Sequence, residues 1–149
     1  LHRWGAVPEN TELTTQSRAL FLAQYVRNGL VPPLADRDEE LSDQEKKGEE
    51  IFLSERAQCA SCHVPETNYT NQAALPLAPL KTRPGFDKEK DSAFKTPSLR
   101  FLVGRAPYLH DGSASSLFNL IEMNHDRMGR TSHLGREDRD ALVAYLETL

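Results

Sequence analysis

The sequence predicts a mostly helical domain with long loops. Apolar side chains recur at helical spacing over residues 17–28, 45–55 and 136–148, which is the pattern of amphipathic helices. The stretch 64–94 is rich in proline and polar residues, and no segment shows a convincing strand pattern or repeat. A close group of two cysteines and a histidine stands between the second helix and this stretch. The length of 149 residues suggests one domain.

The first helix is expected over residues 17–28. Ser17 can cap it, and Leu20, Phe21 and Tyr25 fall on one face. Gly29 is expected to end it. Before it, residues 1–16 are polar and weakly patterned, and Trp4 is interpreted as a packing anchor for this arm.

The second helix is expected to begin after Ser42. The run Ser42-Asp43-Gln44-Glu45 has the form of a capping box, in which Ser42 and Glu45 satisfy each other's backbone N–H groups. Gly48 lies inside this helix, where glycine costs about 1 kcal/mol relative to alanine. A packing reason is therefore expected, and we predict that the last helix, 136–148, crosses at Gly48.

A shorter helix is expected between the second helix and the last one, with Ser115 or Ser116 as its cap. The loop 64–94 is longer than compact domains usually tolerate unless it is functional or lies over another group. Residues 124–134 are expected to be irregular.

Composition excludes several function classes. The net charge is −4 and the isoelectric point is about 5.7, so no nucleic acid is expected as a partner. No apolar run is long enough to span a membrane. The chain begins at Leu1 and shows no signal peptide, so we interpret it as a mature or trimmed form. The mean hydropathy of −0.58 fits a core completed by a large apolar cofactor.

The chemistry is carried by Cys59-Ala60-Ser61-Cys62-His63. The spacing Cys-x-x-Cys-His is the attachment site of a c-type haem, with Cys59 and Cys62 forming the thioethers and His63 binding the iron on the proximal side. A thioredoxin-like redox pair, half a zinc site or a small disulfide are the alternatives. Zinc would need two more soft ligands, and the chain has two cysteines in all. One covalent haem c is therefore expected. Haem attachment through thioethers implies export, so we expect the periplasm.

Two further motifs carry a resemblance. Phe94-Lys95-Thr96-Pro97-Ser98-Leu99-Arg100 and Ala106-Pro107-Tyr108-Leu109-His110-Asp111-Gly112-Ser113 resemble the signature of the C-terminal haem domain of bacterial di-haem cytochrome c peroxidases and the related MauG family. The ending 135–149 is similar to their last helix. The likeness covers residues 42–149 and implies a class I cytochrome c-like helical fold with long loops around one covalent haem.

The sequence also departs from that family. Its members carry two Cys-x-x-Cys-His sites, one on each domain, and this chain has one. The resemblance implies that this chain corresponds to the electron-relay domain of that family. Residues 17–30 resemble the final helix of a preceding module. We therefore expect an N-terminal extension at 1–41, as the end of such a module, and a cytochrome c domain at 42–149.

The sixth iron ligand is expected from residues 123–128, since the resemblance places it just after the helix that begins near Leu117. Met128 precedes a glycine in a run that can reach back over the haem, and it is the expected ligand. Met123, His125 or no sixth ligand at all are the alternatives. His110 is interpreted mainly as a residue that organises its loop.

Cationic side chains are expected near the haem propionates, because charge-assisted hydrogen bonds stabilise partly buried carboxylates. Arg100 is the leading candidate, with Lys95 and Arg105 as others. Pro97 is expected to pack near the haem face.

The sequence therefore predicts a mono-haem domain that transfers electrons. Its expected partner is a redox protein or another domain or subunit of the same enzyme. The alternative is the haem part of a cytochrome c peroxidase or MauG-like oxidoreductase, which the motifs around Pro97 and His110 favour. A third option is the cytochrome domain of a larger dehydrogenase.

Overall fold

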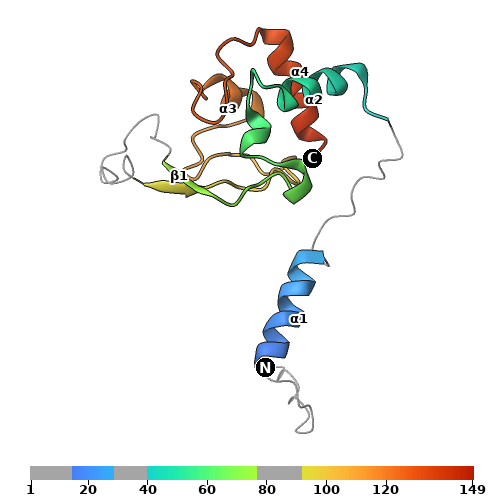
Figure 1. Cartoon of the computed structure of the whole chain (residues 1–149), viewed down its shortest axis with the longest axis vertical. Coiled ribbons are helices and arrows are strands. Elements are labelled where there is room, and N and C mark those ends of the chain that lie inside the picture. Colours follow the sequence, from blue (N-terminus) through green and yellow to red (C-terminus); the bar gives the residue numbers. More distant parts are fainter. Residues whose placement is uncertain (1–14, 29–39, 77–91) are drawn as a thin grey trace, which may run out of the picture. The chain divides into compact units, whose positions relative to one another are not determined.

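The computed structural model describes residues 15–28, 40–76 and 92–149 (Figure 1). Predictions about Trp4, Gly29 and the middle of the 64–94 loop lie outside the described residues. The chain divides into two compact units, Leu1–Glu40 and Leu41–Leu149. Within the described ranges, no helix has the length and apolar character needed to cross a membrane.

The first unit contains helix α1, Thr15–Asn28. The helix predicted over 17–28 is therefore confirmed, but it begins two residues before Ser17, so the prediction of Ser17 as its cap was wrong. Several of its apolar side chains are more than half exposed: Leu20, Phe21, Leu22, Tyr25 and Val26.

The second unit is built on helices α2, Asp43–Leu53, and α4, Arg136–Glu147, which lie side by side in Figure 1. The capping box of α2 is present. Glu45 N donates to Ser42 Oγ at 3.3 Å, and Ser42 N donates to Glu45 Oε2 at 2.6 Å. The predicted crossing at Gly48 is also confirmed, since a Cβ atom on Gly48 would overlap the carbonyl oxygen of Ala141.

The core lies under this crossing. Phe52 of α2 and Leu142 of α4 are almost completely buried, and the Phe52 ring packs against the Tyr145 ring with centroids 5.5 Å apart. Helix α3, Leu117–Glu122, adds Leu117 and Ile121. Its cap is Ser116, whose Oγ accepts from Asn119 N at 3.0 Å. The mostly helical fold class is thereby confirmed.

The prediction of no strand was wrong. A short antiparallel pair, β1 Ala74–Pro76 and β2 Ala93–Lys95, joins Leu75 opposite Phe94. Strands of three residues are too short to show an alternating pattern. Their pairing brings two distant parts of the 64–94 region together and forms one side of the site described below.

The Ala106–Ser113 motif forms a tight hairpin. Tyr108 and Ala114 exchange backbone hydrogen bonds, 2.7 Å from Tyr108 N and 3.3 Å from Ala114 N. Asp111 Oδ1 accepts from Ser113 N at 3.0 Å, and Gly112 has a positive φ of 70°. Tyr108 Oη donates to Leu102 O at 2.8 Å. This motif therefore shapes a loop around Ala114, which is fully buried.

Candidate functional site

The Cys-x-x-Cys-His motif is wound into a single turn after α2. The 3₁₀ helix η1, Cys59–Ser61, follows Gln58, which has left-handed φ and ψ angles. The backbone N–H groups of Cys62 and His63 both donate to Cys59 O, at 3.3 and 3.0 Å. Both cysteines are free thiols, Cys59 buried and Cys62 half-buried. Burial raises the pKa of the Cys59 thiol to about 11.

His63 is held in one tautomer by its neighbour. Its Nδ1 lies 2.9 Å from the carbonyl oxygen of Tyr69, and a carbonyl can only accept, so Nδ1 carries the proton. The lone pair of Nε2 is then available to a metal. Burial lowers the pKa of His63, against the opposing effect of the Tyr69 and Pro97 carbonyl groups, and this favours the neutral imidazole that a metal requires.

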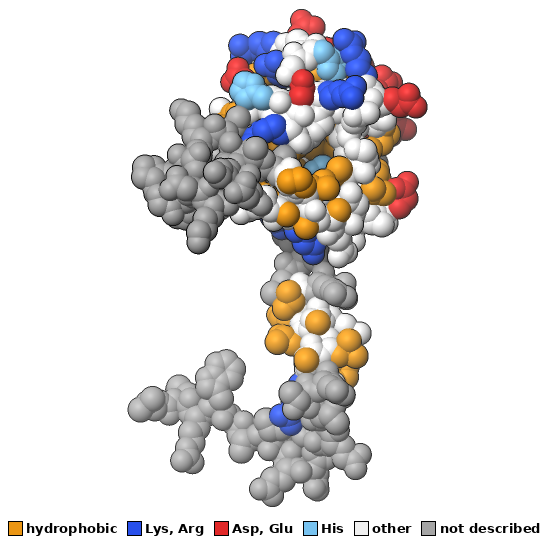
Figure 2. Space-filling view, turned by 60° about the vertical axis from the view of Figure 1, so that its left-hand side comes forward, with side chains coloured by type: hydrophobic (Ala, Val, Ile, Leu, Met, Phe, Trp, Pro, Cys, Tyr) orange, Lys and Arg blue, Asp and Glu red, His pale blue; other side chains and the backbone are white. Residues whose placement is uncertain are grey.

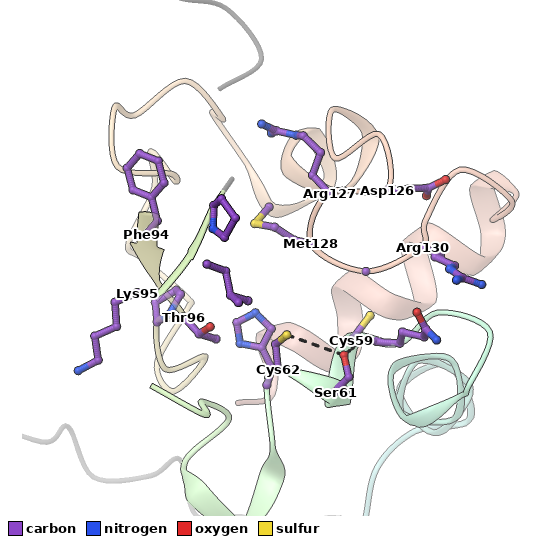
Figure 3. Close-up of a pocket in the computed structure, with 16 residues that line it drawn as sticks. Cys59, Ser61, Cys62, Phe94, Lys95, Thr96, Asp126, Arg127, Met128 and Arg130 are labelled. Atoms are coloured by element: carbon purple, nitrogen blue, oxygen red, sulfur yellow. Dashed lines mark hydrogen bonds between the residues drawn. The ribbon is translucent and has the colours of Figure 1, made fainter. Parts of the chain in front are cut away.

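A cavity of about 400 Å³ opens beside the motif (Figure 3), within the usual size range of cofactor pockets. Its walls come from residues 58–63, from β1 and β2 with the residues that follow β2, and from residues 126–130. The Cys59 and Cys62 thiols, His63 and the Met128 thioether border the same space. Leu75 and Phe94 supply an apolar wall.

The segment that carries Met128 is fixed against the haem motif. Arg130 N donates to Ala57 O at 2.7 Å, and Ala57 is completely buried. Gly129 has φ of 99°, and a Cβ atom there would lie 2.9 Å from Ala57 O and 3.3 Å from Cys59 Sγ. The close approach therefore depends on glycine, and it brings Met128 to the cavity.

The other predicted ligands lie elsewhere. Met123 is the C-cap residue of α3, and neither Met123 nor His125 is among the described residues that border the cavity. The His110 ring packs against the Phe94 ring with centroids 4.5 Å apart, so it touches a wall residue without itself lining the cavity.

Some of the residues predicted to contact the haem border the cavity, and others do not. Pro97 and Lys95 line the cavity. Arg100 is outside the described lining, and its guanidinium lies 5.0 Å from the centre of the Tyr69 ring. Two arginines that the sequence reasoning missed, Arg127 and Arg130, do line it. Their position on either side of Met128-Gly129 is the feature of the sequence that could have indicated them.

In Figure 2, hydrophobic side chains gather on one face of the second unit, near a group of lysine and arginine side chains. The set of donors fits a haem c: paired free thiols one turn apart, an imidazole held through Nδ1, a thioether and an apolar wall. A family model described as cytochrome c matches residues 45–149.

The chain belongs to the cytochrome c family. Among curated proteins it is similar to hydrazine synthase subunit gamma of Kuenenia stuttgartiensis, with 24% identity over 78% of this chain and 44% of that protein. It is also similar to the methylamine utilization protein MauG of Methylorubrum extorquens strain AM1, with 31% identity over 70% of this chain and 34% of that protein.

Two solved structures share the fold of this chain. The hydrazine synthase of Kuenenia stuttgartiensis, solved under xenon pressure, superposes with a TM-score of 0.62 and 25% identity over 78% of this chain and 49% of that chain. A MauG-like protein associated with microbial copper homeostasis has a TM-score of 0.58 and 18% identity, over 85% and 47%. The predicted resemblance to the MauG and di-haem peroxidase family is confirmed. This chain spans less than half the length of each of these proteins.

Membership of the family gives this chain a covalently bound haem c and a role in haem electron transfer. The haem supplies an iron that accepts and returns one electron. Members of this family are typically exported.

Proposed function

We propose that residues 42–149 form a domain with one haem c, which transfers single electrons to or from another protein or another domain or subunit of the same enzyme. The observation that supports this most is that Cys59, Cys62, His63 and Met128 border one cavity. Cys59 and Cys62 attach the haem, His63 provides the proximal ligand through Nε2, and Met128 provides the distal ligand.

A methionine ligand suits this role. A thioether in the sixth position raises the reduction potential and leaves no open site for a small molecule. Met128 comes from a segment hydrogen-bonded to the residue two before Cys59, so both ligand-bearing segments share a rigid base. Rigid ligation keeps the oxidised and reduced states similar, which favours rapid electron transfer.

Propionate recognition is proposed for Lys95 and Arg127, whose positions at the cavity allow charge-assisted hydrogen bonds. Arg127 is fixed by its Nε, which donates to Asn124 O at 3.2 Å. Arg100 stays a prediction for the same role, and Pro97 is proposed to pack on the haem face.

The domain division and the location are proposals too. Residues 1–41 form the N-terminal extension, and its helix α1 is the end of a preceding module. The periplasm is the proposed compartment, because thioether attachment of haem belongs to exported proteins.

A second candidate is supported by the similarity to MauG. Here the domain is the haem part of a peroxidase or MauG-like oxidoreductase. Such chemistry requires an open or weakly filled sixth site, which Met128 would block.

Absorption spectra of the purified chain separate the two candidates. We expect a six-coordinate low-spin spectrum with the methionine–ferric charge-transfer band, unchanged by peroxide. Met128→Ala should remove that band, whereas Met123→Ala, the matched control, should keep it. A high-spin ferric spectrum of the unmodified chain that changes rapidly on adding peroxide would contradict the electron-transfer proposal and favour the enzyme.

A further inference from the structure

Asn124 is an unusual residue in this core. It lies just after α3 and is 1% exposed, one of the largest fully buried side chains in the described part of the chain. A buried amide is costly unless its donors and its acceptor are hydrogen-bonded. The partners of Asn124 therefore indicate why a polar side chain is placed there.

Those partners lie on both sides of one peptide. Met128 N donates to Asn124 Oδ1 at 2.8 Å, and Asn124 Nδ2 donates to Gly129 O at 2.7 Å. A single side chain thus holds the backbone N–H group of Met128 and the carbonyl group of the next residue, Gly129. These bonds fix the position and the direction of the chain at Met128.

The amide is itself anchored to the core. Asn124 Nδ2 also donates to Thr131 Oγ1 at 2.9 Å, and Thr131 Oγ1 donates to the carbonyl oxygen of Ile121 in α3 at 3.3 Å. Thr131 is 3% exposed and Ile121 is 8% exposed. The network therefore runs from helix α3 to the Met128 segment without an exposed member.

The intervening turn needs such support. His125 and Asp126 have positive φ angles of 45° and 58°, a conformation that is uncommon outside glycine, although His and Asp adopt it more readily than most residues. Met128 itself is half-buried, with its thioether directed into the cavity (Figure 3). Packing of the Met128 side chain is therefore only part of what holds the thioether at the cavity.

We propose that Asn124 is a positioning residue that holds the Met128 thioether at the sixth coordination position. The proposal rests on the proposed function, in which Met128 is the distal ligand. Without the amide, the turn relaxes and Met128 spends more time away from the iron. External ligands then compete more successfully for the ferric site.

The test uses the full haem-loaded chain and imidazole as the probe ligand. Asn124→Leu removes all three amide hydrogen bonds at similar volume. We expect at least a tenfold tighter apparent affinity for imidazole, a weaker methionine–ferric charge-transfer band and a lower reduction potential. Thr131→Val should change all three in the same direction by less, and Thr131→Ser, which keeps the hydroxyl, should leave them near the unmodified values.

Leu142→Ala controls for loss of stability alone. Leu142 is completely buried in α4 and is not part of the amide network, so this variant should unfold more easily and yet bind imidazole as the unmodified chain does. If Asn124→Leu binds imidazole no more tightly than Leu142→Ala, measured well below both unfolding transitions, Asn124 has only a structural role and the proposal is wrong.

Met128→Ala separates failure of the proposal from failure of the proposed function. If Met128→Ala keeps the charge-transfer band, Met128 is not the ligand and both ideas fall. If Met128→Ala loses the band while Asn124→Leu keeps it with unchanged imidazole affinity, the distal assignment stands and the positioning role is overturned. Should Asn124→Leu fail to incorporate haem, Thr131→Val compared with Thr131→Ser decides, and equal imidazole affinities for these two would contradict the proposal.

Discussion

His63 and Tyr69 are joined by a hydrogen bond of 2.9 Å from the imidazole Nδ1 to the backbone carbonyl oxygen. The Tyr69 ring is in turn fixed by the core, because it packs edge-on against Phe52 at 5.9 Å and its hydroxyl lies 3.3 Å from that of Tyr145. The carbonyl group that orients His63, the proposed proximal ligand, thus belongs to a residue packed against the crossing of α2 and α4. Tyr69 itself has φ of 57°, a strained conformation that these contacts maintain.

The Tyr69–Tyr145 contact predicts an energetic coupling. Tyr69→Phe and Tyr145→Phe each remove one hydroxyl, and in a double-mutant cycle we expect a coupling of about 0.5–1.5 kcal/mol in the free energy of unfolding. The backbone bond to His63 survives in Tyr69→Phe, so its haem spectrum should be unchanged. Strictly additive effects in denaturant unfolding would show that the hydroxyl pair contributes nothing.

The helix crossing at Gly48 predicts a large loss of stability. Gly48→Ala places a methyl group into the Ala141 carbonyl oxygen and near Tyr145 Cβ, and overpacking of this kind costs about 1–3 kcal/mol or more. The control is Lys46→Ala at an exposed position of the same helix, expected within about 0.5 kcal/mol of the unmodified chain. Thermal and denaturant unfolding measure both. Equal stability of the two variants would contradict the close approach of α2 and α4 at Gly48.

Gly129 and Gly104 form a matched pair for the Met128 segment. Both have positive φ, 99° and 78°, but a Cβ atom on Gly104 meets nothing within 4 Å. Gly104→Ala should therefore cost only the backbone strain, about 1–2 kcal/mol. Gly129→Ala adds the overlap with Ala57 O and the contact with Cys59 Sγ, so it should lose at least about 1 kcal/mol more and weaken the charge-transfer band. Identical spectra and stabilities for the two variants would contradict the close approach.

The ion pair between Lys47 and Asp138 predicts a pH dependence. Lys47 Nζ lies 2.7 Å from Asp138 Oδ1, and this hydrogen bond is the main reason why the pKa of Asp138 is lowered from its usual 3.8. A lowered carboxyl pKa contributes stability above about pH 3.8, and that contribution is lost as the pH falls through the folded-state pKa. Asp138→Asn should be less stable than the unmodified chain near pH 7, by a small amount because both side chains are exposed.

The same difference should shrink as the pH is lowered below about 3.8, and it should also shrink at high salt. Unfolding curves of Asp138→Asn and the unmodified chain across pH and salt test this. A difference that stayed constant down to pH 2 would show that the carboxylate is not responsible.

Local patterns were enough to predict the helices and the haem motif. The capping box at Ser42, the crossing at Gly48 and the spacing of Cys59, Cys62 and His63 all depend on residues close in sequence or on a single small side chain. Met128 was singled out because a glycine follows it. The structure supplies the reason, since only glycine fits against Ala57 and Cys59 at that point.

Other features depend on contacts between distant residues. The β1–β2 pair joins short segments on either side of residues 77–91, and no local pattern indicated it. The stacking of the Arg100 guanidinium over the Tyr69 ring also joins distant parts of the chain, and the propionate role of Arg100 stays a prediction. The sequence did not indicate the structural role of Asn124. An asparagine after a short helix is common, and only its burial and its hydrogen-bond partners distinguish this one.

The most direct test of the haem assignment is mass spectrometry of the denatured chain after expression with the haem-attachment machinery. We expect the mass of one haem to remain bound under denaturing conditions and to map to the peptide that contains Cys59–His63. Changing both cysteines, in Cys59→Ala/Cys62→Ala, should abolish the added mass. A denatured chain that carries no haem, or that keeps it after both cysteines are changed, would contradict the assignment.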